Sequence, residues 1–244
     1  MLELKNVSFT ISSPAGETHI IDNISMTVPD GDLLVLTGPN GGGKTTLAKL
    51  IMGLEQPTGG QILWNGEDIT GLDVTERAKR GISYGFQQPP RFKGITVGSL
   101  LAIASGNNEL TREEGCEYLR RVGLCAEDYI NREVDTALSG GEVKRIEIAT
   151  VLARQSGLMI LDEPEAGIDL WSFAKLTETF EAIHADRKTT MIIISHQERI
   201  ISLADRIVIV ANGNLARIGT LDKIFPSLAE RHVGEKCDDC CVFS

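Results

Sequence analysis

The chain has 244 residues, 42% of them apolar and 24% charged, which is typical of a folded globular protein and argues against extensive disorder. A formal net charge of −10 at pH 7 argues against nucleic acid as the main partner, because a phosphate backbone needs a basic surface. No apolar run approaches the roughly 20 residues of a membrane-spanning helix, and no secretion signal is evident, so we expect a cytoplasmic protein that can still dock on a membrane protein.

Short strands are expected in the first part of the chain. Leu2–Phe9 alternates apolar and polar residues with one slip, and Asn23–Val28 repeats that pattern, as half-exposed antiparallel strands do. Leu33–Thr37 is an apolar run, which predicts a parallel strand covered on both faces. Lys44–Met52 then has helical spacing and is closed by Gly53.

Helix-forming residues dominate from about residue 89 to residue 153, after a strand and tight turn within residues 61–66. Alternation of strands and helices returns after Gly157, so a helical insert splits an α/β core. The expected helices are Val97–Ala104, Arg112–Val122, Glu142–Ala153 and Trp171–His184. The expected later strands are Leu158–Leu161, Met191–Ile194, Arg206–Val210 and Leu215–Ile218.

A glycine-rich loop between a buried strand and a helix matches the pattern G-x-x-x-x-G-K-[ST]. Backbone N–H groups in such a loop bind phosphate oxygens, aided by the positive end of the helix dipole. Lys44 is expected to reach the β- and γ-phosphates of ATP, and the Thr45 hydroxyl to bind Mg²⁺. The expected phosphate-binding residues are Gly38, Pro39, Asn40, Gly41, Gly42, Gly43, Lys44, Thr45 and Thr46.

Two consecutive acids follow the apolar strand at residues 158–161. Asp162, at the carboxyl end of this strand, is expected to hold Mg²⁺ near the glycine-rich loop. Glu163 then stands where a carboxylate can polarise the attacking water. Two acids after an apolar run are common in isolation. Because they follow a phosphate-binding loop here, they indicate a metal-binding and a catalytic residue.

A second candidate anion site precedes the helix expected at 142–153. Ser139 and two glycines lead into that helix, whose N-terminal N–H groups can bind an anion. In isolation the same residues describe an ordinary serine-capped helix.

Taken together, these motifs resemble the ATP-binding cassette (ABC) family over most of the chain. Leu138–Glu142 looks like the family signature LSGGQ, with Glu142 in place of glutamine. The resemblance implies that the signature binds the γ-phosphate held by the loop of a second copy, so that a head-to-tail dimer encloses two nucleotides. The implied signature contacts are Ser139, Gly140, Gly141 and Glu142.

Three further positions match motifs of the same family. Gln87 resembles the glutamine that senses Mg²⁺ and water, and is therefore a candidate catalytic and metal-binding residue. Asp169, after Ala166-Gly-Ile, resembles the loop that contacts the other copy. His196, after a strand and Ser195, resembles the switch histidine that contacts the γ-phosphate.

The resemblance implies an α/β fold of the P-loop NTPase class and ABC type. Such a fold has a mixed-sheet core, an N-terminal antiparallel β region and an inserted helical subdomain. We expect the nucleotide-binding core at residues 1–88 and 154–236, the helical subdomain with its signature at 89–153, and a cysteine-rich tail at 237–244.

Finer features resemble the SufC group, the ATPase of the Suf iron–sulfur cluster assembly system. They are the sequences that begin at Arg80, Gly94, Ser139 and His196. Glu163-Pro-Glu-Ala-Gly-Ile-Asp departs from the pattern of many bacterial members and indicates a divergent, minimal or archaeal version. This resemblance implies a SufB- or SufD-like scaffold as partner. The alternative is a transport cassette that docks on a membrane permease, and residues 89–93 would face the partner in both cases.

The aromatic residue that usually stacks on adenine in the family is missing. Its place falls near Ile11, and Phe9 or Ile20 are the available substitutes. Adenine binding is therefore expected to be weaker than phosphate binding.

Five cysteines in a chain without an evident signal peptide do not indicate a disulfide framework. Cys237, Cys240 and Cys241 have spacing suited to a soft metal, but a closed site needs a fourth ligand. The alternative is a solvated tail. Cys116 and Cys125 lie in the helical insert and are expected to be packing residues.

Overall fold

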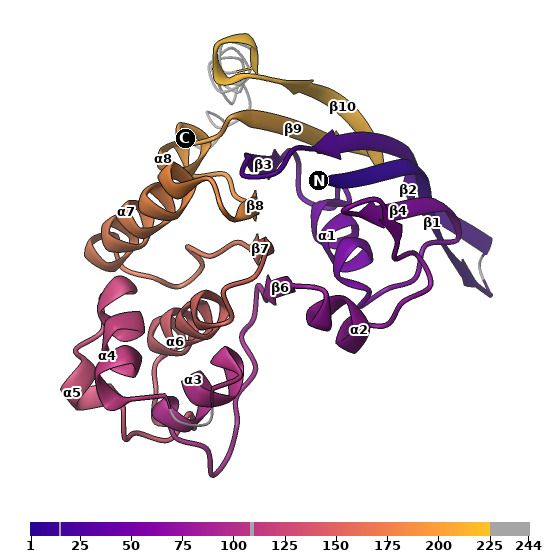
Figure 1. The fold of residues 1–244 in the computed structure, drawn as a ribbon. Helices are drawn as coiled ribbons and strands as arrows, with labels where there is room; N and C mark the ends of the chain where they lie inside the picture. Colours follow the sequence, from indigo (N-terminus) through magenta and orange to yellow (C-terminus); the bar gives the residue numbers. More distant parts are fainter. Residues whose placement is uncertain (15, 108–109, 225–244) are drawn as a thin grey trace, which may run out of the picture.

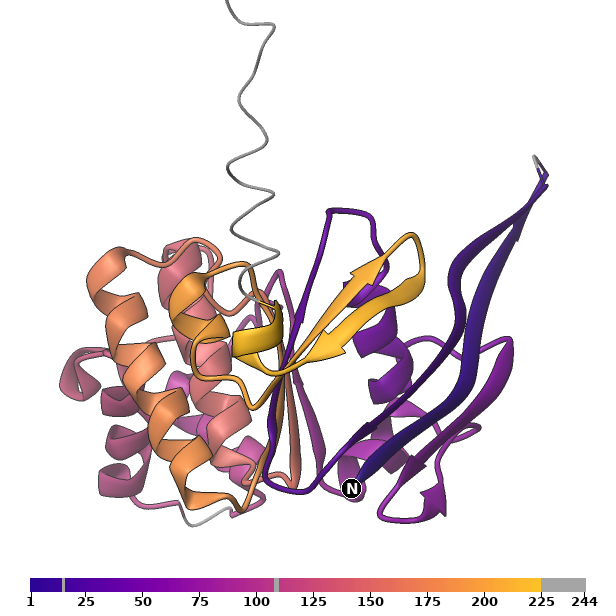
Figure 2. The ribbon, with the colours of Figure 1, turned by 90° about the horizontal axis from the view of Figure 1, so that it is seen from above.

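The computed structural model of the chain describes residues 1–14, 16–107 and 110–224. It has three layers: helices on one side, a six-stranded sheet in the middle, and helix α1 with an antiparallel sheet on the other side (Figure 2). The strands are β1 (Leu2–Ser13), β2 (Gly16–Val28), β3 (Leu33–Thr37), β4 (Gly59–Trp64), β5 (Glu67–Asp68), β6 (Ile82–Gly85), β7 (Leu158–Asp162), β8 (Thr190–Ile194), β9 (Arg206–Ala211) and β10 (Asn214–Gly219). The helices are α1 (Lys44–Met52), α2 (Val74–Lys79), α3 (Val97–Ser105), α4 (Arg112–Arg121), α5 (Ala126–Tyr129), α6 (Gly140–Ala153), α7 (Leu170–Asp186) and α8 (Glu198–Ile201).

The central sheet has the strand order β10-β9-β3-β8-β7-β6, with every neighbouring pair parallel except β10 with β9. Both faces of β3 are buried. Leu33 and Val35 pack into the core shared with the helices α3 to α7, whereas Leu34 and Leu36 pack against α1 and the antiparallel sheet. This double coverage explains the apolar run of β3 and confirms the expected α/β fold.

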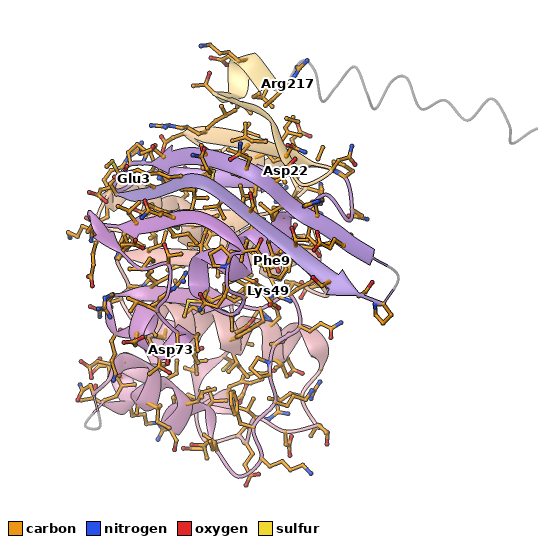
Figure 3. The ribbon with its side chains drawn as sticks, turned by 90° about the vertical axis from the view of Figure 1, so that its right-hand side faces the viewer. Glu3, Phe9, Asp22, Lys49, Asp73 and Arg217 are labelled. Atoms are coloured by element: carbon orange, nitrogen blue, oxygen red, sulfur yellow. The ribbon has the colours of Figure 1, made fainter. Side chains whose placement is uncertain are left out.

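The second sheet has the order β2-β1-β4-β5 and is antiparallel throughout. Figure 3 looks onto this sheet and labels Glu3 and Phe9 on β1 and Asp22 on β2. The slip in the alternation of β1 coincides with a register shift between Leu4 and Val7, where Asn6 takes a positive φ of 52°. A bulge of this kind bends a strand without ending it, so β1 continues to Ser13.

Helices α3, α4 and α5 lie together beside α6, away from the N-terminal strands (Figure 1). The helices expected from the sequence are present within one or two residues at each end. Helix α6 begins two residues earlier than expected, because Ser139 caps it and Gly140 and Gly141 form its first turn. Elements α2, β6, α5 and α8 were not expected, since runs of four to six residues carry little periodicity.

The two cysteines of the helical insert differ in their surroundings. Cys116 is buried, as expected, but Cys125 is exposed at the start of α5, so the packing role predicted for Cys125 is wrong. Cys237, Cys240 and Cys241 lie outside the described residues. Within the described ranges, no helix combines the length and the apolar character needed to cross a bilayer.

Candidate active site

The glycine-rich loop runs from the end of β3 to the start of α1 and packs against β9. Gly38 has a φ of 130°, and a Cβ added there would lie 2.3 Å from the Val210 carbonyl oxygen. A Cβ on Gly42 would lie 2.6 Å from the same oxygen. Only glycine allows this approach, so the loop is held with its backbone accessible to a ligand.

The turn between β9 and β10 fixes the loop from outside. The backbone N–H of Gly213 donates to the Gly42 carbonyl at 3.0 Å, and the N–H of Asp22 donates to the Gly213 carbonyl at 2.8 Å. Residues far apart in the sequence therefore immobilise the loop before any phosphate binds. From the sequence, Asn212-Gly213 is only part of the connection between two expected strands.

Lys44 is 6% exposed, and its Nζ donates to the Gly38 carbonyl at 2.7 Å and the Pro39 carbonyl at 2.9 Å. Burial lowers the pKa of this ammonium, and Glu163 and Asp162 oppose the shift. Thr45 and Thr46 form the first turn of α1 with Lys44, and no acidic residue neutralises the dipole there. Asn40 and Gly41 are exposed. The loop thus presents backbone N–H groups and one cation, the chemistry that binds phosphate.

Asp162 stands at the carboxyl end of β7 and is 1% exposed. The Thr45 hydroxyl donates to one of its carboxylate oxygens at 3.2 Å, and the Tyr84 hydroxyl donates to the other at 3.0 Å. Burial raises the pKa of Asp162, so its charged form lacks a sufficient counter-charge in the protein alone.

The described part of the chain holds no group of three His, Cys, Asp or Glu side chains arranged for a metal ion. Mg²⁺ needs fewer protein ligands when phosphate oxygens and water complete its shell. A desolvated carboxylate beside the hydroxyl of Thr45 fits that requirement, and both groups offer the oxygen ligands that Mg²⁺ prefers.

Glu163 follows β7 with a φ of 45°, a left-handed conformation that a residue other than glycine rarely adopts. Its N–H donates to the Ile194 carbonyl at 3.0 Å, which continues the pairing of β7 with β8. Its carboxylate accepts a hydrogen bond of 2.8 Å from the Gln87 side-chain amide. Strained backbone of this kind is concentrated at functional sites. Here the strained residue is Glu163, and it is hydrogen-bonded to Gln87, the other residue predicted from the sequence.

His196 lies after β8, and its Nδ1 is 3.3 Å from the Thr37 hydroxyl at the end of β3. Desolvation and the nearby Lys44 lower the pKa of His196, which favours the neutral imidazole. The preceding Ser195 donates to a Glu165 carboxylate oxygen at 2.6 Å. This bond ties the loop after β7 to the loop that carries His196.

Lys144 and Glu147, which sequence reasoning missed, form a buried ion pair on α6. The Nζ of Lys144 is 3.3 Å from Glu147, and it also donates to the carbonyls of Phe86 and Asp162. Glu147 in turn accepts from the Phe86 N–H at 2.8 Å. Phe86 directly precedes Gln87, and Asp162 directly precedes Glu163. The ion pair therefore holds the backbone next to both of these residues. The spacing of three positions suits an ion pair on one helix face, but α6 also carries Glu142 and Arg145, so the sequence does not single out this pair.

The signature residues form a second group. Gly141 packs so closely on the loop after β7 that an added Cβ would lie 2.6 Å from the Gly167 carbonyl oxygen. Asp169 caps α7 by accepting from the N–H groups of Trp171 at 3.1 Å and Ser172 at 3.0 Å. Among the described residues, no hydrogen bond or ion pair joins Ser139, Gly140, Gly141, Glu142 or Asp169 to the glycine-rich loop.

The sequence pattern of the ABC transporter family matches residues 21–166, more than half of the chain, from β2 past the glycine-rich loop and the signature to Glu163. The chain belongs to the ABC transporter family. ATP is accordingly its nucleotide, and this family member is an ATPase.

Two curated relatives place the chain among the ATP-binding proteins of this family. An ABC transporter ATP-binding protein of Methanocaldococcus jannaschii is 36% identical, and the match covers 84% of each chain. The sulfate/thiosulfate import ATP-binding protein CysA of Synechocystis is 33% identical over 88% of this chain and 60% of its own length. The chain thus spans less than two thirds of that import protein.

A solved structure of the same fold is a dimeric ATP-binding cassette in a post-hydrolysis state, bound to ADP and Pi. It has a TM-score of 0.82, is 23% identical, and the match covers 91% of this chain and 99% of that one. The likeness confirms the ABC-type fold.

The adenine-binding position of this ABC ATPase stays a prediction. Ile11 is 48% exposed on the β1–β2 hairpin, and Phe9 packs in part against the core between the two sheets. The Ile20 carbonyl lies against Gly43 and Gly213, so Ile20 borders the glycine-rich loop.

Lys144→Met is expected to destabilise this ABC ATPase by about 3–5 kcal/mol, because Glu147 would be left as an unpaired buried charge. Adding Glu147→Leu removes that charge and is expected to recover most of the stability. Turnover is expected to stay about tenfold or more below the parent in both variants, because Phe86 and Asp162 lose the group that sets their spacing.

Denaturant unfolding and steady-state ATPase assays of the two variants measure these effects. Parent-like turnover in the double variant would show that the ion pair serves stability alone.

Proposed function

We propose that the chain is the ATP-hydrolysing subunit of a membrane transporter, and that two copies bind ATP between them to move a membrane permease. The observation that carries the proposal is an apolar groove beside Gln87, because a transport ATPase must transmit its conformational change to another protein. The relationship to a sulfate/thiosulfate import ATP-binding protein supports the choice of a transporter.

The groove has a volume of about 210 Å³ and lies between the segment after β6 and helices α3 and α6. Three large apolar side chains at its rim are exposed: Phe86 and Phe92, each at 36%, and Ile103 at 64%. An exposed apolar patch next to a polar active site indicates a protein-binding surface. Because Phe86 precedes Gln87, a partner seated here would contact the segment that positions the Gln87–Glu163 pair.

Under this proposal different residues of the chain have different roles in ATP hydrolysis. Lys44 and the loop N–H groups bind the phosphates, and Thr45 and Asp162, with Gln87, hold Mg²⁺. When bound, Mg²⁺ neutralises charge on the phosphate oxygens. Glu163 orients the attacking water and accepts its proton, while His196 contacts the γ-phosphate.

The paired arrangement rests on the separation of the two groups of site residues. Among the residues that the structure describes, no hydrogen bond or ion pair joins Ser139 or Asp169 to the glycine-rich loop of the same copy. A second copy in head-to-tail orientation would bring its signature to the γ-phosphate and complete the site.

The SufC-like role favoured by the motif resemblance is the weaker candidate. The curated relatives reported above are an ABC transporter ATP-binding protein and a sulfate/thiosulfate import protein, so they support the permease rather than a SufB- or SufD-like scaffold. The domain division and the cytoplasmic location stay predictions.

Phe92→Asp is expected to weaken capture of the partner by about 30-fold or more, because it places a charge in the apolar groove. The tagged parent and variant are compared for the membrane protein that each retains from detergent-solubilised native membranes. ATP binding should be unchanged. Ile218→Asp serves as control, since Ile218 is also an exposed apolar residue but lies on β10. Retention of a soluble scaffold instead of a polytopic membrane protein would contradict the proposal.

A further inference from the structure

Glu142 places a negative charge in the first turn of the signature helix, where the family signature has an uncharged glutamine. The proposed dimer brings the γ-phosphate of the other copy to this helix end. The helix dipole attracts an anion, but a carboxylate in the same turn repels it. The charge of Glu142 must therefore be restrained for the site to work.

The structure holds both oxygens of that carboxylate. Oε2 accepts a hydrogen bond of 2.7 Å from the backbone N–H of Ser139, which turns the side chain back toward the start of the helix. Oε1 accepts a hydrogen bond from the Tyr129 hydroxyl and lies 3.7 Å from Nη1 of Arg132. The backbone N–H groups of Gly140 and Gly141, at the first two helical positions, have no acceptor within the helix.

Tyr129 and Arg132 also hold each other. The Arg132 guanidinium carbon is 5.0 Å from the centroid of the Tyr129 ring, a cation–π contact. The hydrogen bonds from Ser139 and Tyr129 lower the pKa of Glu142 to about 2, with a smaller contribution from Arg132. Glu142 is therefore ionised at physiological pH, so restraint of the carboxylate, rather than its protonation, must limit repulsion.

We propose that Tyr129 and Arg132 are positioning residues that fix the Glu142 carboxylate and partly neutralise its charge, so that the signature helix can accept the γ-phosphate of the ATP bound by a second copy of this chain. We call this pair the carboxylate clip. The inference rests on the proposed paired function and adds a determinant of ATP-driven pairing outside the signature itself. If the pair only supported α5 and the cap of α6, loss of the Tyr129 hydroxyl would weaken dimer formation equally with and without the Glu142 carboxylate.

Tyr129→Phe tests the clip, because it removes one hydroxyl and keeps the ring under Arg132. The variant is made in a Glu163→Gln chain, and the ATP concentration needed for half-maximal dimer formation is measured by light scattering. We expect an increase of about tenfold at low ionic strength, since the freed carboxylate repels phosphate. At roughly 0.5 M salt the increase should largely vanish, because salt screens repulsion between accessible charges.

The same substitution in a Glu142→Gln background is the decisive comparison. With no carboxylate to restrain, Tyr129→Phe should leave the ATP requirement within about twofold of its background, the additivity expected of uncoupled sites. Tyr118→Phe is the matched control, since the Tyr118 hydroxyl also makes one side-chain hydrogen bond in the helical region, which it accepts from the Gln155 amide at 3.2 Å.

Equal weakening with Glu142 present and in the Glu142→Gln background, or no salt dependence, would overturn the clip and leave the dimer intact. An unchanged ATP requirement for Tyr129→Phe would overturn it as well. A Glu163→Gln chain that stays monomeric at saturating ATP would instead contradict the proposed paired function, and the clip with it.

Discussion

Glu163→Gln is expected to lower ATP turnover by about 100-fold or more while ATP binding stays close to that of the parent. Glutamine preserves the size of the side chain and can still accept the hydrogen bond from the Gln87 amide, but it cannot accept a proton from water. Hydrolysis should therefore stop after both sites have closed. Light scattering is expected to show an ATP-dependent dimer that persists in the variant and dissociates in the parent as ATP is consumed.

The left-handed backbone at residue 163 calls for a matched control. Glutamine tolerates a φ of 45° no better and no worse than glutamate, so a change in turnover reports the carboxylate rather than the strain. Glu198→Gln is a suitable comparison, because Glu198 is an exposed carboxylate only two residues after His196. Parent-like turnover in Glu163→Gln would assign the water-polarising role to another group.

The glycine-rich loop and the strand ends could be predicted because their chemistry is local in the sequence. A loop of fixed spacing between an apolar strand and a helix defines its own geometry, and Asp162 and Glu163 follow the strand that ends beside it. Parallel strands place their carboxyl ends on one edge of a sheet. The meeting of Thr45 with Asp162 at 3.2 Å is a direct consequence.

The supporting residues could not be predicted, since their roles depend on burial and on contacts distant in sequence. Lys144 reads as a surface residue in the sequence, yet it is 1% exposed and binds carbonyls from two loops. Tyr84 belongs to β6, a strand of only four residues, and its hydroxyl reaches Asp162 from 78 positions away. The exposure of Cys125 likewise depends on where α5 begins, which composition does not reveal.

The residues of the candidate active site do not distinguish between the two candidate partners. The residues assigned to ATP, from Gly38 to His196, would serve a permease and an assembly scaffold equally well. Closure of the proposed dimer would move either partner in the same way. The SufC-like features lie in short segments around these shared motifs, whereas the curated relatives match over more than 80% of the chain. Similarity over most of the chain carries more weight than similarity in short segments.

Lys44→Ala is expected to weaken ATP binding by about 100-fold or more, because the lysine is the only cation of the glycine-rich loop, residues 38–45. The same substitution also leaves the Gly38 and Pro39 carbonyls without their donor, which is expected to cost about 1–3 kcal/mol of stability. Lys44→Met keeps the packing of the aliphatic chain and removes the ammonium group with its N–H donors, so it separates the loss of packing from the loss of the ammonium.

Titration with a fluorescent ATP analogue and thermal unfolding of the same samples measure binding and stability independently. Lys49→Ala is the control, because Lys49 lies on the same helix α1 (Figure 3) but in its last turn, whereas Lys44 begins the helix. If Lys44→Met folds like the parent and still binds ATP within about threefold of it, the loop N–H groups and the helix dipole alone would account for phosphate binding. Loss of binding in a stable Lys44→Met chain would instead show that the dipole cannot hold the γ-phosphate without the lysine, even though no acid opposes it in the first turn of α1.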